Sequence, residues 1–296
     1  MPLQNTGQIL CAARQIGTCV GAFNIVDYLT LEAVIRAGES LQSPVIVQTS
    51  TATVKRYTAA TLVTLAHSIA DRCQAAVGLH LDHGTDLNII RECVEAGYTS
   101  VMIDASHFPF EENIARTRQV VEAAHERGLA VEGEIGVLAG IEDDLVIDQD
   151  RASYTAPEEA IEFQARTGVD FLAVAIGTAH GFYKTPPRLD IDTLRCIRQQ
   201  VDFPLVVHGG SGLSFDVVRS LIRAGASKMN VSTQLKKTYI DALDEYIQLH
   251  REEYNPLHLL QHAYDRLVDM ISGYIQLYIC PDAPSPKVMP VRLQSV

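Results

Sequence analysis

The 296-residue chain is 47% hydrophobic and 20% charged, a balance typical of a globular protein with a sizeable core and not of a disordered one. Its 24 Lys and Arg against 36 Asp and Glu leave a net charge of -12 without a basic run, which argues against nucleic acid or an anionic membrane as a partner. The N-terminus lacks a signal-peptide pattern, no apolar run reaches the roughly 20 residues of a membrane span, and the six scattered cysteines include no CxxC pair, so we expect a soluble cytoplasmic protein with free thiols.

Apolar, β-branched runs alternate with amphipathic stretches from near the start of the chain to past residue 250. Several of these stretches end in a glycine, the residue that commonly stops a helix, as in EAG (95–97) and RAG (223–225). We therefore predict eight strands, each followed by a helix. The strands are expected at 19–25, 44–50, 76–83, 99–106, 130–136, 171–177, 204–210 and 228–233, and the helices at 28–41, 58–73, 86–96, 111–127, 157–167, 191–200, 214–224 and 234–250.

Eight strand–helix units with nearly continuous apolar strands favour an α/β fold of the closed parallel type, the (β/α)8 TIM barrel. The alternative is an open, doubly wound sheet, which would want a GxGxxG motif after its first strand, where this chain has NIVDYLT (24–30). We expect one domain over 1–280, including an additional C-terminal helix at 256–271, and a Pro-rich extended tail over 281–296. An acidic insertion at 137–156 breaks the alternation, and a loop of such length is usually functional or disordered.

Polar residues stand at or just beyond the ends of the predicted strands, where a barrel builds its active site. They are Asn24, Ser50, Asp82, His83, Asp104, Glu132, Glu134, His180, His208 and Asn230. Three of these residues, His83, His180 and His208, are histidines followed directly by glycine. Catalytic Zn2+ typically takes three protein ligands and keeps one position open, so three imidazoles at one rim fit a metal site. The alternative is three ordinary hydrogen-bonded loop histidines, and spacing alone leaves both interpretations open.

Two polar turns indicate a phosphate-binding site. HGGSG (208–212) and NVST (230–233) each open a predicted helix, after the seventh and eighth strands. Barrels often bind phosphate in these two loops, through backbone N–H groups at helix N-termini. Lys184 would add a positive charge nearby. A glycine-rich turn alone can be merely a tight turn, but two such turns in the two expected loops favour the phosphate.

Carboxylates complete the predicted site. Asp82 precedes a candidate ligand and could act as an acid or base beside a metal. In the insertion, Glu142, Asp143 and Asp144 form an acidic cluster, from which one carboxylate could close over a substrate and move a proton. The other interpretation of this cluster is a solvated acidic loop.

Together these motifs resemble the class II, metal-dependent ketose-bisphosphate aldolases, and especially their tagatose-bisphosphate branch. The matching segments are GAFNI (21–25), SPVIVQTS (43–50), LHLDHG (79–84), SVMIDASH (100–107), EGEIGVLAGIEDD (132–144), AVAIGTAHGFYK (173–184), VVHGGSGL (206–213) and KMNVSTQLK (228–236). They follow in order over most of the chain, and LDHG with GTAHG and HGGSG is a specific combination.

The resemblance implies a lyase that reversibly cleaves a ketose 1,6-bisphosphate, either D-tagatose or D-fructose 1,6-bisphosphate. The products would be dihydroxyacetone phosphate and glyceraldehyde 3-phosphate, formed through a Zn2+-stabilised enediolate. By the same resemblance, His83, His180 and His208 bind one Zn2+, with Glu134 as an alternative ligand when the metal shifts. Asp82 would exchange the C4 hydroxyl proton.

The remaining roles also come from the resemblance. Glu142 would exchange the C3 proton of dihydroxyacetone phosphate, and Asn24 and Ser50 would face the aldehyde half of the substrate. The donor phosphate would be held by Gly181, Lys184, Gly209, Gly210, Ser211, Asn230, Val231, Ser232 and Thr233. Relatives carry a monovalent cation (Na+ or K+) beside that phosphate and form homodimers or homotetramers, and some tagatose-type systems include a companion subunit.

Two departures from the family pattern bear on the substrate. Ser232 stands where fructose-type members often have Asp, which is closer to the tagatose type. In the C-terminal helix, Leu257, Gln261 and Tyr264 stand where relatives place basic residues that can serve the distal phosphate of a neighbouring subunit. A second expectation is therefore an aldehyde that is unphosphorylated or carries a different acid group.

Two other classes of function are weighed against the aldolase. A metal-dependent hydrolase would use a zinc-bound hydroxide and would not need paired phosphate turns. A non-catalytic barrel subunit that supports a partner would be expected to lack a ligand or Asp82. Both turns, the three histidines and Asp82 are present, which favours the aldolase.

Overall fold

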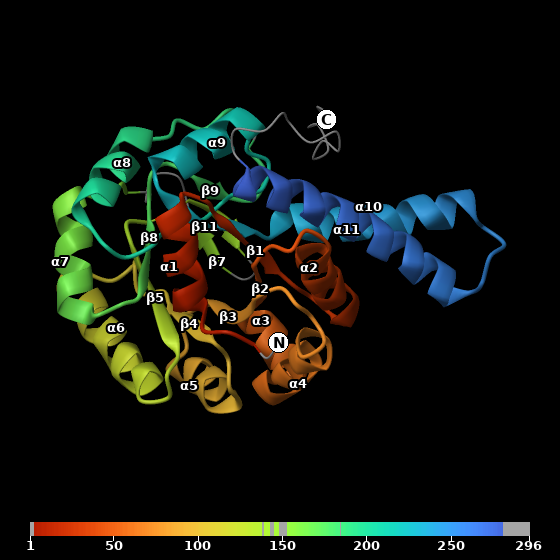
Figure 1. The fold of residues 1–296 in the computed structure, drawn as a ribbon, viewed down its shortest axis with the longest axis horizontal. Coiled ribbons are helices and arrows are strands. Elements are labelled where there is room, and N and C mark those ends of the chain that lie inside the picture. The colour runs from red at the N-terminus through yellow and green to blue at the C-terminus, as the bar shows by residue number, and fades with distance from the viewer. Residues whose placement is uncertain (1–2, 138, 143–144, 148–152, 184, 281–296) are drawn as a thin grey trace.

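Eight parallel strands close into a barrel at the centre of the structure, a computed structural model that describes residues 3–137, 139–142, 145–147, 153–183 and 185–280. Around the barrel the strands follow the order β1-β11-β10-β8-β5-β4-β3-β2. They are Val20–Asn24 (β1), Val45–Ser50 (β2), Val77–Gly84 (β3), Ser100–Ile103 (β4), Ala130–Ile135 (β5), Phe171–Val174 (β8), Leu205–Val207 (β10) and Ala226–Val231 (β11). This closed sheet (Figure 1) confirms the predicted (β/α)8 TIM barrel.

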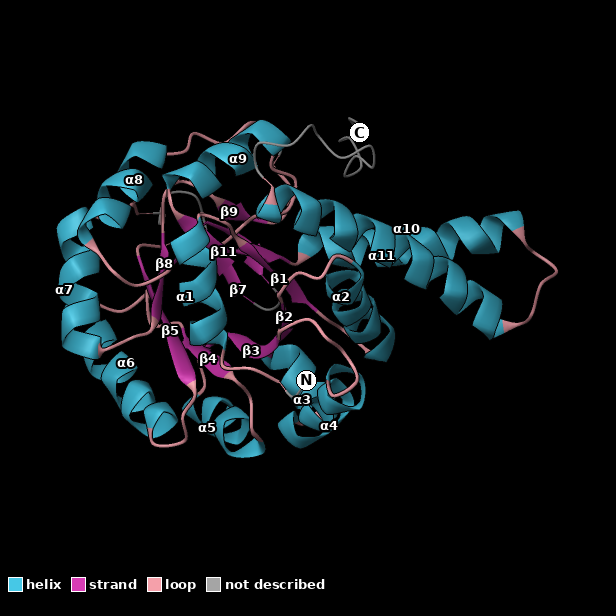
Figure 2. Ribbon diagram, viewed as in Figure 1, coloured by secondary structure: helices cyan, strands magenta, loops and turns pink. Residues whose placement is uncertain are grey.

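A ring of helices surrounds the strands (Figure 2). The helices that match the predicted ones are Tyr28–Ser40 (α2), Ala59–Ala70 (α4), Leu87–Ala96 (α5), Phe110–His125 (α6), Pro157–Thr167 (α7), Ile191–Gln200 (α8), Phe215–Ala224 (α9) and Thr233–Leu249 (α10). Gly97, Gly168 and Gly225 end three of them in the left-handed conformation, as the glycine stops predicted. A short helix that was not predicted, Thr51–Tyr57 (α3), begins directly after β2.

The helix α1, Thr6–Ile16, was not predicted either, and it closes the floor of the barrel. Asn5 caps its first turn and Gly17 ends it. Its apolar residues pack against a cluster of inward side chains from several strands: Ile9, Leu10 and Ala13 against Val20, Ala22, Ile46, Ala130, Phe171, Ala173 and Val206. The helix precedes the first strand, so it lies outside the strand–helix alternation that guided the prediction.

The acidic insertion contains a hairpin where the sequence predicts a loop. Strand β6 (Ala139–Glu142) pairs antiparallel with β7 (Leu145–Ile147) and parallel with β9 (Ala179–His180). Gly140 lies opposite His180 with φ at +118°, and a Cβ at Gly140 would come within 2.4 Å of the His180 carbonyl oxygen. Only glycine permits this approach. The pairing therefore fastens the insertion to the strand that ends in a candidate ligand.

The additional C-terminal helix is present and longer than predicted. Helix α11 spans Pro256–Ile279, packs against α10 and α2, and projects with α10 away from the barrel (Figure 1). Its last turns carry buried Tyr274 and Tyr278, and the Tyr274 ring contacts Phe23 of β1 edge-on. The Pro-rich tail 281–296 lies outside the described residues, so the domain division at 280 stays a prediction.

Two sequence expectations concern membranes and thiols. Among the described residues, no helix has the combination of length and apolar character that crossing a bilayer requires. All six cysteines lie in the described ranges and are free, three of them buried and three exposed. This agrees with the scattered spacing seen in the sequence.

Candidate active site

Three histidines converge at the C-terminal end of the barrel. His83 lies on β3, His180 ends β9, and His208 directly follows β10. Their ligand nitrogens all lie within 4.8 Å of one another, with His83 Nε2 and His208 Nδ1 2.9 Å apart. The structure thus brings together the three histidines that the sequence places at or beyond strand ends.

The backbone at His83 is held in an unusual conformation. Its φ is +46°, in the left-handed region that a non-glycine residue rarely occupies. The pairing of β3 with β4 shifts register between Leu81 and Gly84, so His83 lies in a bulge that turns its side chain. Gly84 allows this bulge, because a Cβ there would come within 2.5 Å of the Met102 carbonyl oxygen. Such backbone strain is typical of functional positions.

A carboxylate contacts the far nitrogen of each of the two facing imidazoles. Asp104 Oδ2 lies 2.8 Å from His83 Nδ1, and Glu132 Oε1 lies 2.8 Å from His208 Nε2. Burial alone would raise the pKa of Asp104, but its hydrogen bonds to His83 and Ser106 lower the pKa below its usual range. Glu132 follows the same pattern: burial opposes ionisation, yet Lys228 and His208 hold its pKa well below the usual value. Both carboxylates were noted at strand ends, but the sequence assigned them no role.

The cluster fits a zinc ion. A tetrahedral Zn2+ with Zn–N bonds of about 2.0–2.1 Å would place two ligand nitrogens about 3.3 Å apart, close to the observed 2.9 Å. With their far nitrogens on carboxylates, His83 and His208 turn Nε2 and Nδ1 toward the same point. Burial lowers the pKa of His208, which favours the neutral imidazole that a metal needs.

Glu134 belongs to a second group of ligand atoms. His83, Asp104 and Glu134 also have ligand atoms within 4.8 Å of one another, and Glu134 Oε2 lies 3.7 Å from His83 Nδ1. Glu134 therefore approaches His83 from the side of Asp104 rather than from the side of the other two histidines. The two groups share the His83 imidazole, and each contains residue types that could hold a cation.

Asp82 is held by two asparagines beside the histidines. Asn24 Nδ2 donates to Oδ2 of Asp82 at 2.8 Å, and Asn230 Nδ2 donates to Oδ1 at 3.0 Å. Gln48 Nε2 in turn donates to Asn24 Oδ1 at 2.6 Å, and all four residues are buried. Gln48 was missed, although a polar residue within the apolar strand VIVQTS was an available signal.

The predicted phosphate turns interlock with one another and with the segment after His180. Gly210 N donates to the Asn230 carbonyl at 3.0 Å, and Gln234 N donates to Ser211 Oγ at 3.1 Å. Gly209 has φ at +71°, and a Cβ there would come within 2.4 Å of the Ala179 carbonyl oxygen. The two turns and the β9 segment therefore form one packed surface.

Tyr183 ties this surface together and was not predicted. Its hydroxyl donates to the Gly209 carbonyl at 2.7 Å and accepts from Ala179 N at 3.0 Å. Burial raises the pKa of Tyr183 to about 12, so the hydroxyl keeps the proton it donates. Gly181 lies between Ala179 and Tyr183 in the chain. Its φ is +92°, and a Cβ at this position would point into open space.

The other predicted residues occupy less central positions or cannot be placed. Ser50 ends β2 half-buried, and its Oγ accepts from Thr53 N at 3.3 Å as the cap of α3. Val231 ends β11, Ser232 precedes α10, and Thr233 is its first residue. Glu142 is the last residue of β6, and only its backbone is described. Lys184, Asp143 and Asp144 lie outside the described residues.

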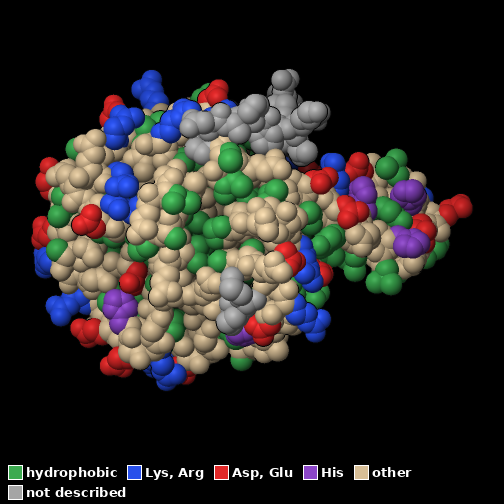
Figure 3. All heavy atoms as spheres, viewed as in Figure 1, with side chains coloured by type: hydrophobic (Ala, Val, Ile, Leu, Met, Phe, Trp, Pro, Cys, Tyr) green, Lys and Arg blue, Asp and Glu red, His purple; other side chains and the backbone are tan. Residues whose placement is uncertain are grey.

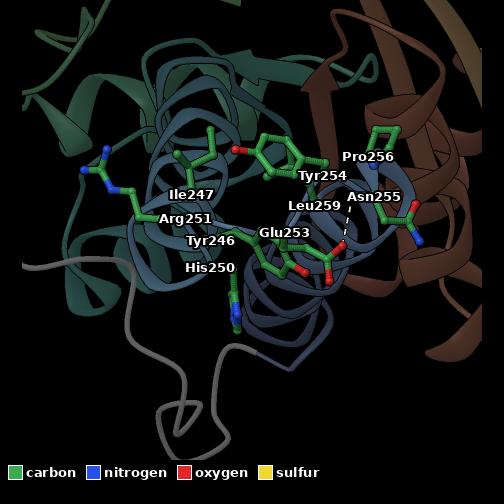
Figure 4. A pocket seen from close by; sticks show the side chains of 9 residues that line it. All are labelled: Tyr246, Ile247, His250, Arg251, Glu253, Tyr254, Asn255, Pro256 and Leu259. Carbon is green, nitrogen blue, oxygen red and sulfur yellow. Dashed lines mark hydrogen bonds between the residues drawn. The ribbon is translucent and has the colours of Figure 1, made fainter.

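A separate hollow lies at the outer end of the α10–α11 hairpin, remote from the histidines in the chain fold. It is lined by Tyr246, Ile247, His250, Arg251, Glu253, Tyr254, Asn255, Pro256 and Leu259 (Figure 4). Hydrophobic and histidine side chains gather on this projection (Figure 3), and Leu249, Tyr254 and Leu257 are 70%, 89% and 70% exposed. None of these lining residues belongs to the predicted site.

Metal binding is the first testable consequence of this geometry. We expect about one Zn2+ per purified chain, and we expect His180→Ala to lose it because three ligands become two. Inductively coupled plasma mass spectrometry after dialysis measures the content. His258→Ala is the matched control, since that imidazole is 60% exposed on α11. Full zinc content in His180→Ala would contradict the assignment of this ligand.

Comparisons with known proteins identify the family of the chain. The chain matches the family model for "Fructose-bisphosphate aldolase class-II" over residues 4–282. It is 32% identical to the YdjI aldolase from Escherichia coli K12, with a TM-score of 0.82 and coverage of 93% of this chain and 97% of that one. A putative fructose-1,6-bisphosphate aldolase from Coccidioides immitis is 28% identical, with a TM-score of 0.86 and coverage of 93% and 96%. The fructose-bisphosphate aldolase (Fba) from Campylobacter jejuni, 24% identical over 92% of this chain and 93% of that one, shares the fold with a TM-score of 0.80. Since the family match spans nearly the whole sequence, this chain belongs to the class II fructose-bisphosphate aldolase family and is a lyase.

Proposed function

We propose that this aldolase is Zn2+-dependent and reversibly cleaves D-tagatose or D-fructose 1,6-bisphosphate to dihydroxyacetone phosphate and glyceraldehyde 3-phosphate. One observation carries the proposal: the three-histidine cluster, the doubly held Asp82 and the interlocked turns occupy one end of one barrel. A metal, a proton-transfer group and an anion site are the three elements that such a cleavage needs.

In this proposal His83, His180 and His208 hold the zinc, and Glu134 takes part in an alternative position beside Asp104. When bound, Zn2+ would supply Lewis acidity to the oxygens of the donor half of the substrate. A metal in that role makes a lysine Schiff base unnecessary.

Asp82 is proposed to take the C4 hydroxyl proton in cleavage and to return it in condensation. The amide groups of Asn24 and Asn230 donate to its two oxygens and fix the plane of the carboxylate. Asn230 Oδ1 is buried and has no hydrogen-bond partner among the described residues, which leaves an acceptor for a substrate hydroxyl. Asn24 and Ser50 are proposed to face the aldehyde half.

The donor phosphate is proposed to bind the interlocked turns, where α10 begins at Thr233 and the positive end of its helix dipole faces the turns. The residues that would hold it are Gly181, Lys184, Gly209, Gly210, Ser211, Asn230, Val231, Ser232 and Thr233. A monovalent cation, Na+ or K+, beside this phosphate is part of the proposal. Glu142 is proposed to exchange the C3 proton, and the pairing of its strand with His180 supports its delivery to the site.

A second candidate differs in the aldehyde. Neither Leu257 nor Gln261 carries a positive charge that could bind a distal phosphate. Leu257, at the outer end of α11, is apolar and 70% exposed, and Gln261 is a neutral amide whose Nε2 donates to Asp265. The second candidate is therefore an aldolase of the same family whose acceptor is unphosphorylated or carries another acid group. The hydrolase and the supporting subunit gain no comparable support, because the phosphate turns, the histidines and Asp82 are all in place.

We also propose that the chain is a homodimer or homotetramer. The exposed Leu249, Tyr254 and Leu257 on the projecting hairpin support this, because apolar groups gathered on one projection mark an interaction surface. Sedimentation velocity should find an oligomer for the wild-type chain and a smaller species for Tyr254→Asp/Leu257→Asp. A wild-type monomer would rule the proposal out, and an oligomer that contains a different chain would indicate a companion subunit.

Deuterium exchange into dihydroxyacetone phosphate, followed by NMR, tests the donor chemistry without the aldehyde. We expect exchange that a chelator abolishes. Asp82→Ala should retain exchange and zinc, while cleavage falls about 10^2- to 10^4-fold through loss of its proton transfer. If Asp82→Ala lost its zinc, the role assigned to this carboxylate would be wrong.

The acceptor is tested by comparing kcat/KM for ketose 1-phosphates and ketose 1,6-bisphosphates. The second candidate predicts that the distal phosphate brings no gain, because the hairpin supplies no basic residue at Leu257 or Gln261. A strong preference for the bisphosphate would eliminate this candidate and leave glyceraldehyde 3-phosphate as the product.

A further inference from the structure

A fully buried ion pair lies beneath the histidine cluster, inside the barrel. Lys228 Nζ donates to Glu132 Oε2 at 2.8 Å, and both side chains are 0% exposed. Lys228 comes from β11 and Glu132 from β5, strands that are not neighbours in the barrel, so the pair spans the interior. Buried pairs of this kind contribute little net stability, because desolvation offsets their attraction. Their presence in a core that apolar residues could fill calls for another reason.

The two oxygens of the Glu132 carboxylate contact different partners. Oε2 accepts from Lys228 and lies 3.3 Å from His80 Nε2, while Oε1 accepts from His208 Nε2 at 2.8 Å. Since a carboxylate can only accept, the proton of the neutral His208 ring must sit on Nε2. The lone pair of His208 then sits on Nδ1, the atom that faces His83 Nε2 at 2.9 Å.

We propose that Glu132, held in place by Lys228, is the positioning residue that fixes the tautomer and orientation of His208 and thereby sets the affinity of the metal site. This inference rests on the proposed metal site and deepens it. Lys228 keeps the Glu132 carboxylate aligned from β11, a strand that does not neighbour β5, and neither residue would touch the metal or the substrate. The pair acts on the reaction only through His208.

The test replaces the pair without leaving a buried charge behind. Glu132→Met/Lys228→Met removes the acceptor and its counter-ion together, with side chains of similar length, an exchange that buried ion pairs often tolerate. We expect the zinc dissociation constant, measured by competition with a chromogenic chelator, to rise about 10- to 100-fold, the usual cost of losing such a partner. Glu132→Gln/Lys228→Met, which keeps a neutral acceptor, should fall between this variant and the wild type.

Ser100→Ala is the matched control. Ser100 Oγ lies 2.8 Å from His80 Nδ1 in the same buried region, and its side-chain hydrogen bonds are to His80 and Thr6 rather than to Glu132 or His208. Its removal disturbs the polar interior and should leave zinc affinity unchanged. Circular dichroism of each metal-free variant establishes that it is folded. A folded Glu132→Met/Lys228→Met chain with wild-type zinc affinity would overturn the inference.

A second readout does not depend on any variant. In the metal-free wild-type chain, 15N NMR of the histidine rings should find His208 as the neutral Nε2–H tautomer, and the Nδ1–H tautomer would overturn the inference even if zinc binds. A wild-type chain that binds no zinc, with His208 in the Nε2–H form, would instead remove the metal site from the proposed function while leaving the positioning of the ring intact. The two failures are therefore distinguishable.

Discussion

Closing a parallel sheet on itself encloses the inward side chains of its strands, and every polar group placed there must find its partner among the other enclosed groups. The apolar side chains in the lower part of this barrel need no such partner, and α1 covers them from below. Higher up, Glu132 and Lys228 satisfy each other from strands that are not adjacent. Because an unpartnered buried charge is so costly, the two groups can only remain where they meet. This constraint also affects the rim above, because Glu132 is the carboxylate that contacts His208.

The rim shows the same principle with neutral donors. Asp82 has an asparagine on each of its oxygens, and the two predicted phosphate turns form hydrogen bonds with one another. Asp82, His83 and His208 therefore each have a hydrogen-bond partner that fixes the orientation of the side chain. The site is organised before a substrate arrives, which lowers the entropy that binding must overcome.

Local patterns in the sequence were sufficient to predict the strands and the polar residues at their ends. Each predicted strand overlaps an observed one, and the histidines beside glycine do meet at one rim. What could not be predicted depends on pairs that are distant in the chain. Glu132 meets Lys228 across 96 positions, and Tyr183 meets Gly209 across 26, and no local period reports such contacts. Helix α1 and the β6–β7 hairpin escaped for a simpler reason, because both lie outside the repeating strand–helix unit.

The pairing of Gly140 with His180 has a mechanical consequence for the insertion. A hairpin joined by backbone pairing to the strand that carries a histidine of the cluster is no free flap, because its displacement strains that strand or breaks the pairing. A displacement of β6 would thus also displace the backbone of His180. A different loop grafted here would therefore also move the histidine cluster, through the backbone pairing of Gly140 with His180.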